Sequence, residues 1–264
     1  MRKNGPLSLL FHCLVIVFML APLIIVCLVA FTPEPTLSLP TTHWSLRWFE
    51  TLLEHDEFIS SFWLSLGLAA GSATLSCLIS IPAGIALVRY DFPGKNAISG
   101  LLFSPLLIPH LVLGVALMRM FTLMGVNGSL FWLLIAHIVV ITPYVLRLIL
   151  TALVGFDRST EQAAQSLGAS NLIVFFKITL PIIAPGIAGG WALAFINSFD
   201  EVTMSVFVTS PSTITLPVRM YMYTTESIDP MIAAVSTVMI FITAILMFVI
   251  DRFYGLDRLL IGKN

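Results

Sequence analysis

The sequence predicts an all-α, polytopic membrane protein with six transmembrane helices and with both termini in the cytoplasm. Hydrophobic residues make up 58% of the 264 residues and charged residues only 10%, whereas a soluble domain carries about 25% charged residues. The mean hydropathy is correspondingly high, at +1.00. Two further observations give the number and direction of the helices: the length of the apolar runs, and the distribution of cations between them.

Each of the apolar runs is long enough to cross a bilayer as a helix, which takes about 20 predominantly apolar residues. None alternates every second residue, as a strand of a membrane barrel would. The first run is too long for a signal peptide and has no clear cleavage site, so we expect an uncleaved anchor. The six spans are placed at about 7–31, 60–88, 98–124, 130–150, 182–208 and 231–250.

The lysine and arginine residues indicate the orientation of the spans. If the N-terminus is cytoplasmic, ten of the 13 cations lie on the inner side and three on the outer side, as the positive-inside rule requires. The inner cations are Arg2, Lys3, Arg89, Lys95, Arg147, Arg158, Lys177, Arg252, Arg258 and Lys263. The outer cations are Arg47, Arg119 and Arg219.

Several kinds of function have no sign in the sequence. The net charge of −1 gives no indication of a nucleic-acid partner, and the partner that the composition predicts is the lipid bilayer. We find no G-x-x-x-x-G-K-[ST] phosphate loop, no H-E-x-x-H metal motif and no G-x-S-x-G nucleophile elbow. We therefore expect no catalytic residue, no bound metal and no cofactor on this chain.

One long polar segment, residues 151–181, joins the fourth span to the fifth. It is far longer than the two to eight residues that usually connect neighbouring helices, so we expect it to be functional. Ser159 followed by Gln162 predicts a capping box at the start of a helix. Gly168 predicts the left-handed residue that ends it.

A second helix of this segment is predicted to begin after Ser170, whose hydroxyl can cap it, and to end at Pro181. Ala163, Ala164 and Leu167 share one face of the first helix, where two alanines allow close approach of another protein. A cytoplasmic cap over the ends of the bundle would need the same features. The physical argument alone leaves both interpretations open.

The same segment resembles the EAA loop of inner-membrane permease subunits of binding-protein-dependent ABC importers. That signature is Glu-Ala-Ala, three residues, Gly, nine residues and Ile-x-Leu-Pro. The residues in register are Ala163, Ala164, Gly168, Ile178, Leu180 and Pro181. Gln162 occupies the position of the glutamate and Glu161 stands immediately before it, so the charge at the motif position itself is lost.

The resemblance implies a type I ABC importer permease fold, with residues 1–264 as a single transmembrane permease domain of a bacterial inner membrane. It implies a homologous permease subunit, two ATPase subunits that bind ATP and Mg, and a periplasmic solute-binding protein as partners. The residues that it assigns to coupling with the ATPase are Glu161, Gln162, Ala163, Ala164, Leu167, Gly168, Ile178, Leu180 and Pro181.

The similarity extends over most of the chain and is strongest to the spermidine/putrescine branch, through residues 89–117, 136–145 and 198–221. It implies a polyamine as the solute. Permeases for other small solutes, such as an amino-acid derivative, an opine, a phosphonate or iron, share the same frame. An ion-coupled secondary transporter also stays open, because the prolines inside the spans favour transport of either kind.

Two adjacent carboxylates, Asp200 and Glu201, are predicted to lie inside the fifth span, about 27 Å from its start. A charge at this depth needs a partner or a wet cavity. We expect one of the two to meet an ammonium group of the solute and the other to hold the helix in place, although an ion-pair network would explain both. His110, beside Pro109, is the third candidate for the substrate path.

Overall fold

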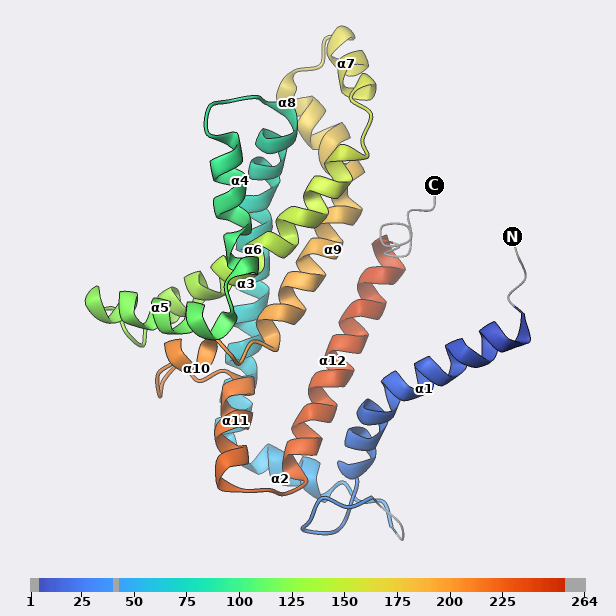
Figure 1. Ribbon diagram of the computed structural model, residues 1–264, viewed down its shortest axis with the longest axis vertical. Helices are drawn as coiled ribbons and strands as arrows, with labels where there is room; N and C mark the ends of the chain where they lie inside the picture. Colours follow the sequence, from blue (N-terminus) through green and yellow to red (C-terminus); the bar gives the residue numbers. More distant parts are fainter. Residues whose placement is uncertain (1–4, 40–42, 255–264) are drawn as a thin grey trace. The chain divides into compact units, whose positions relative to one another are not determined.

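The computed structural model of the chain describes residues 5–39 and 43–254, and within these ranges all regular structure is helical. This confirms the predicted fold class. Five stretches are long and apolar enough to cross a membrane, and a bent pair of helices provides up to one more. The long helices are α1 (Pro6–Val29), α3 (Asp56–Arg89), α6 (Leu130–Val154), α9 (Leu180–Phe199) and α12 (Met231–Tyr254) (Figure 1).

Shorter helices join them and carry most of the polar residues discussed below. They are α2 (Arg47–Glu54), α4 (Lys95–Phe103), the 3-10 helix η1 (Ser104–Leu107), α5 (His110–Leu123), α7 (Ser159–Ser166), α8 (Asn171–Val174), the π-helix η2 (Phe175–Thr179), α10 (Ser205–Val208) and α11 (Leu216–Glu226).

The third predicted span, 98–124, is not one straight helix. Lys95–Leu107 and His110–Leu123 meet at an angle of 109°. The bend lies at Ile108, whose backbone is extended (φ −99°, ψ 126°), because the ring of Pro109 disfavours the helical conformation of the preceding residue. The third predicted span is therefore a bent pair of helices and not a single straight one.

The fifth predicted span, 182–208, is displaced toward the N-terminus. A helical stretch runs from Asn171 to Phe199, so Pro181 does not end the second helix of the polar segment as predicted. Pro181 is the second residue of α9, where a missing N–H is tolerated. The π-helical turn η2 joins α8 to α9 immediately before it. At the other end, Asp200 and Glu201 follow the helix and do not lie inside it.

The chain divides into two compact units. The first comprises the described residues up to Ser60 together with Arg219–Thr243. Within it, Glu57 forms an ion pair with Arg219 at 3.3 Å. The hydroxyl of Tyr223 donates to Asp229 at 2.6 Å. The pKa of Tyr223 is raised to about 12, mainly by burial and in second place by this hydrogen bond to Asp229.

The second unit comprises Ser61–Val218 together with the described residues from Ala244 onward, and it contains both candidate sites. Its centre is the pair α6 and α9, which lie side by side (Figure 1). Two glycines of α9 permit this contact. A Cβ at Gly186 would lie 2.6 Å from the Cβ of Ala152, and one at Gly190 would lie 3.3 Å from the Cα of Val145.

Four of the cations on which the orientation rests (Arg2, Lys3, Arg258 and Lys263) lie outside the described residues, as do the two ends of the chain. Within the second unit, the Arg89 end of α3 and the polar segment lie at the same end, because Arg89 contacts Glu161. The orientation itself stays a prediction that labelling can test.

We expect single cysteines at Thr36 and Ser227, in a background without the native cysteines, to react with an impermeant reagent in intact cells. Cysteines at Gly94 and Ser159 should react only after the membrane is opened. Thr36, Gly94 and Ser159 are exposed and Ser227 is half-buried, so protection would report the membrane rather than burial. Labelling of Ser159→Cys in intact cells would place the polar segment on the outer side and contradict the orientation.

Candidate functional site

Polar residues gather at the two ends of α9. We call residues 151–181 the coupling loop and residues 200–204 the acidic bend. The coupling loop holds the predicted ATPase contacts. The acidic bend holds Asp200 and Glu201, two of the three predicted substrate contacts, and the third, His110, is the first residue of α5. Each is built by hydrogen bonds between neighbouring residues and by a contact with a distant part of the chain.

The turn at Gly168 forms as predicted. Gly168 takes the left-handed conformation (φ +89°). Its N–H donates to the carbonyl of Gln165 at 2.9 Å, and the N–H of Ala169 donates to the carbonyl of Ala164 at 3.0 Å. These two bonds make up a Schellman motif, which satisfies the last free carbonyl groups of α7.

The capping box predicted at the start of α7 does not form. Ser159 is the first residue of the helix, and it donates to Asp157 rather than accepting from Gln162. Its N–H donates to Oδ1 at 2.9 Å and its hydroxyl to Oδ2 at 2.7 Å. A carboxylate accepts more strongly than a hydroxyl. The bonds from the Ser159 hydroxyl and backbone lower the pKa of Asp157 below its usual value.

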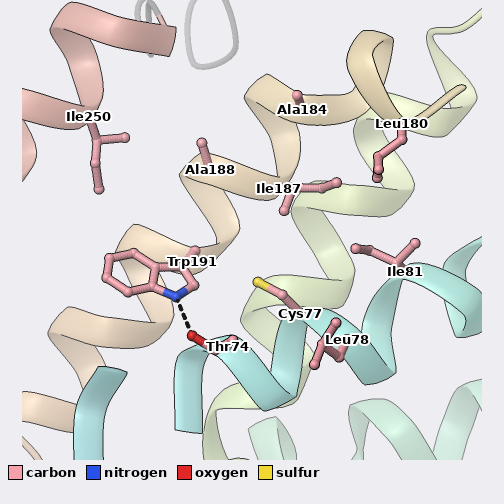
Figure 2. Close-up of a pocket in the computed structure, with 10 residues that line it drawn as sticks. All are labelled: Thr74, Cys77, Leu78, Ile81, Leu180, Ala184, Ile187, Ala188, Trp191 and Ile250. Atoms are coloured by element: carbon pink, nitrogen blue, oxygen red, sulfur yellow. Dashed lines mark hydrogen bonds between the residues drawn. The ribbon is translucent and has the colours of Figure 1, made fainter. Parts of the chain in front are cut away.

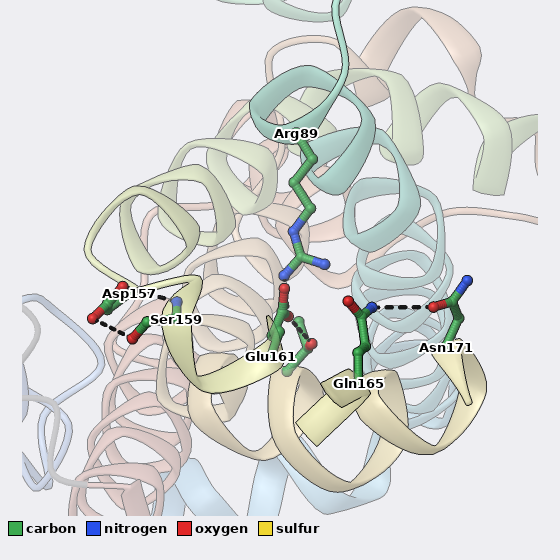
Figure 3. Close-up of polar contacts among 7 residues, drawn as sticks. Arg89, Asp157, Ser159, Glu161, Gln165 and Asn171 are labelled. Carbon is green, nitrogen blue, oxygen red and sulfur yellow. Dashed lines mark hydrogen bonds and ion pairs between the residues drawn. The ribbon is translucent and has the colours of Figure 1, made fainter. Parts of the chain in front are cut away.

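The second helix begins as predicted, because the hydroxyl of Ser170 accepts from the N–H of Ile173 at 3.4 Å. The side-chain amide of Gln165 also donates to Asn171 at 3.1 Å, so that α7 is tied to α8 across the Gly168 turn (Figure 3). The two short helices therefore form one structured unit.

The predicted coupling residues fall into three groups. Gln162, Ala163, Leu167 and Gly168 are exposed and Ala164 is half-buried on α7 and its turn. Ile178, Leu180 and Pro181 lie in the helical stretch that leads into α9. Glu161 is separate from both groups, because its side chain is buried inside the second unit.

Among the exposed residues, Leu167 stands out, since 90% of its surface is accessible. Leu172, on α8, is 71% exposed. Both side chains are accessible to a partner at the polar end of this helical unit. The geometry of the loop thus provides a small apolar surface with alanines beside it.

The acidic bend separates the two carboxylates by environment. Asp200 is exposed, whereas the side chain of Glu201 is only 7% exposed. One oxygen of Glu201 lies 2.8 Å from Nδ1 of His110, and the other accepts from the N–H of Met204 at 2.7 Å. Glu201 thereby joins the start of α5 to the bend, and of the two acids only Asp200 is exposed.

A buried histidine braces the same region, and sequence reasoning did not assign it to the site. His137 of α6 contacts Ser198 through Nδ1 at 2.8 Å and Ser205 through Nε2 at 3.1 Å. Ser198 contacts Ser72 at 3.0 Å, and Ser72 donates to the carbonyl of Ala69. The hydroxyl proton of Ser72 is engaged by the Ala69 carbonyl, so in the contact between the two serines Ser198 is the donor. Ser198 must then accept from His137, which places the proton of the neutral imidazole on Nδ1.

The only feature of the sequence that pointed to this network is His137 itself, because a histidine inside an apolar run needs polar partners in a membrane. The partners themselves, on α3, α9 and α10, come from other parts of the chain and are not marked by any spacing. The chain of bonds holds both sides of the acidic bend, at Ser198 and at Ser205.

An apolar groove of about 480 Å³ lies elsewhere in the second unit, between residues of α3, α9 and α12. Trp191 donates from its indole N–H to Thr74 at 3.0 Å across this groove (Figure 2). Its ten lining residues, which include Cys77, Ile187 and Ile250, contain no charged side chain. The groove is therefore unsuited to a cationic ligand. The acidic bend is the candidate site for such a ligand.

Comparison with known proteins gives the context of these features. Residues 76–256 match the family described as binding-protein-dependent transport system inner membrane component. The spermidine/putrescine transport system permease protein PotC of Escherichia coli K12 is 34% identical over 200 residues, which cover 76% of each chain. The putrescine transport system permease protein PotI of the same strain is 33% identical over 230 residues, covering 84% of this chain and 82% of PotI.

Solved structures agree on the fold. A bacterial ABC transporter involved in the import of alginate superposes with a TM-score of 0.65 at 15% sequence identity, covering 96% of each chain. At this identity the likeness supports the fold alone.

Proposed function

This chain belongs to the family of binding-protein-dependent transport system inner membrane components, and we propose that with a homologous permease subunit it forms the translocation path for a polyamine of the putrescine or spermidine type. The observation that carries the solute class is the similarity to PotC and PotI over three quarters or more of the chain. Family membership also argues against an ion-coupled secondary transporter.

The chemistry of the acidic bend supports a cationic solute. A polyamine is a flexible chain with two or more ammonium groups, each of which pairs with a carboxylate. None of the ion pairs within residues 5–39 and 43–254 involves Asp200. Because a charge at membrane depth costs about 2.5–3.5 kcal/mol on insertion scales, an exposed carboxylate there is best explained by a wet path that a cation enters.

The division of labour at the bend fits the same proposal. Glu201 is held by His110 and by the N–H of Met204, so it fixes the backbone that presents Asp200. His110 acts through Glu201, and we assign it the role of positioning the bend. Asp200 is then the residue of this chain that meets the ammonium group.

Energy would come from other subunits. We propose that the complex contains two ATPase subunits, which bind ATP and Mg, and that one of them seats on the exposed face of α7 around Ala163, Leu167 and Gly168. A periplasmic binding protein would deliver the solute at the outer side, where five acidic residues lie before or at the start of the second long helix (Glu34, Glu50, Glu54, Asp56 and Glu57). This chain would supply no catalytic residue and no cofactor of its own.

The test is uptake by the complete complex in proteoliposomes, with ATP enclosed and binding protein outside. We expect saturable uptake of labelled putrescine or spermidine that requires both ATP and the binding protein, and none with an ATPase subunit that lacks its phosphate-loop lysine. Uptake of a phosphonate or an amino-acid derivative in place of the polyamines would show that the complex serves another solute and would contradict the proposal.

A further inference from the structure

Glu161 belongs to α7, yet its side chain does not share the exposed face of that helix. Only 7% of the side chain is exposed, and its ion-pair partner Arg89 is 14% exposed. Nη2 of Arg89 lies 2.5 Å from Oε1 of Glu161. Figure 3 shows the guanidinium group of Arg89, at the end of α3, directed at the Glu161 carboxylate. The residue predicted to meet an ATPase thus meets another helix of its own chain.

A third helical element joins this contact. The hydroxyl of Thr179 donates to the same oxygen of Glu161 that Arg89 contacts, and Thr179 is fully buried. Thr179 is the last residue of the π-helical turn, immediately before α9. Glu161, Arg89 and Thr179, which we call the inner link, therefore connect α7 to the ends of two long helices.

The helix ends on which Arg89 and Glu161 lie stabilise the charges of these two residues. Arg89 is in the last turn of α3 and Glu161 is in the first turn of α7, which are the helix ends that stabilise a cation and an anion respectively. π-helical turns are often found at functional sites. Here the wider turn ends at Thr179, whose hydroxyl donates to the Glu161 carboxylate.

A buried ion pair is weak evidence for stability, because desolvation offsets most of the attraction between the charges. An apolar contact at this position would hold the fold equally well. What the inner link adds is a directional connection between α7 and α3. These two helices are far apart in the chain, since Arg89 and Glu161 are separated by 72 positions.

Along the chain, α7 continues through the Gly168 turn into α8 and the π-helical turn before it reaches α9. The inner link connects α7 directly to the ends of α3 and α9. On α3, Ser72 bonds to Ser198, next to the acidic bend. Ser72 and Arg89 lie about 25 Å apart along the helix, so α3 reaches from the coupling loop to the bend.

We propose that Glu161 is a positioning residue that passes the displacement of α7 to α3 and α9 together. When the ATPases move the coupling loop, the inner link pulls both helices as one body and so acts on the acidic bend. This inference rests on the coupling role proposed for the loop and does not depend on which solute is carried.

The test measures solute molecules taken up per ATP hydrolysed in the reconstituted complex. Glu161→Gln keeps the shape and the acceptor for Thr179 but removes the charge. We expect it to assemble with the ATPase while uptake per ATP falls at least about fivefold, the lower end of typical couplings between sites. Thr179→Val, which removes only the hydroxyl, should lower the same ratio by a smaller factor.

Asp91→Asn is the matched control. It breaks the exposed pair between Lys95 and Asp91, at 3.0 Å, which follows α3 directly, and uptake per ATP should equal that of the wild type. The exchange Arg89→Glu with Glu161→Arg should recover part of the ratio, because it restores an ion pair at the same place.

Three results would overturn the inference. The first is a Glu161→Gln complex with the wild-type ratio. The second is loss of the ATPase from Glu161→Gln, which would assign Glu161 to the docking surface. The third is a wild-type ratio of uptake to ATP hydrolysis in Thr179→Val, which decides against the inner link even if Glu161→Gln does not insert into the membrane. A wrong solute assignment would instead abolish polyamine uptake in the wild type, so the two failures are distinguishable.

Discussion

Replacing Gly168 by valine is expected to release the ATPase from an otherwise folded permease. Gly168 has φ +89°, a conformation that costs a β-branched residue about 1–3 kcal/mol. The substitution therefore opens the Schellman turn and misplaces α8 relative to α7. We expect the fraction of ATPase that co-purifies with the permease to fall about tenfold or more, with uptake lost in proportion.

Two controls isolate the cause of that loss. Gly168→Asn should keep most of the ATPase, because asparagine adopts the left-handed conformation at little cost. Gly94 has a similar conformation (φ +84°), and a Cβ at either glycine would meet nothing within 4 Å. Gly94→Val thus introduces the same strain at another turn of the same unit and should retain the ATPase. If Gly168→Val holds the ATPase in full and uptake persists, the coupling loop is only a cap.

Ala163→Trp tests the same surface without strain in the backbone. Ala163 is exposed, so an indole ring at this position does not disturb the second unit itself. It should overfill a groove of the ATPase and reduce co-purification to a similar extent.

Local signals were sufficient for part of the fold and of the coupling loop. The apolar runs placed the long helices, because the bilayer sets their length. Gly168 and Ser170 were predicted correctly, because a left-handed turn and a helix cap each depend on a few neighbouring residues. Ser159 was assigned the wrong role because a nearby carboxylate, Asp157, competes for its hydroxyl.

Two prolines show where the run of apolar residues misleads. Pro109 turns the chain by 109° at the residue before it, whereas Pro181 lies within the first turn of α9 and interrupts nothing. Hydropathy does not distinguish these cases, because both prolines follow apolar residues. The position of a proline within its helix decides between them, and that position depends on where the preceding turn starts.

The pairings that organise both sites join residues far apart in the chain. Glu161 with Arg89 and Glu201 with His110 are separated by 72 and 91 positions. The sequence indicated that a charge at the depth of Glu201 needs a partner, but it did not name His110, and nothing in the sequence marked Glu161 as buried. That depends on how α3, α5 and α9 pack, which no local pattern specifies.

The two acids of the bend are expected to respond differently to neutralisation. Asp200→Asn should leave the complex assembled and reduce the apparent affinity for a polyamine about tenfold or more, the loss that follows removal of one charged hydrogen-bond partner. Uptake per ATP should be largely preserved once the solute saturates. A solute analogue without the ammonium group should show a smaller penalty, because Asp200 would contact only the charge.

Glu201→Gln should instead impair uptake of every solute, since it weakens the contact with His110 and the bond from the N–H of Met204 that shape the bend. Glu226→Gln is the matched control, because Glu226 is an exposed acid of the α11 helix and its loss should change neither affinity nor turnover. Polyamine uptake equal to that of the wild type in both Asp200→Asn and Glu201→Gln would exclude the bend from the substrate path. Equal losses for the polyamine and its neutral analogue in Asp200→Asn would leave Asp200 a structural acid, because a contact with the ammonium group must discriminate between them.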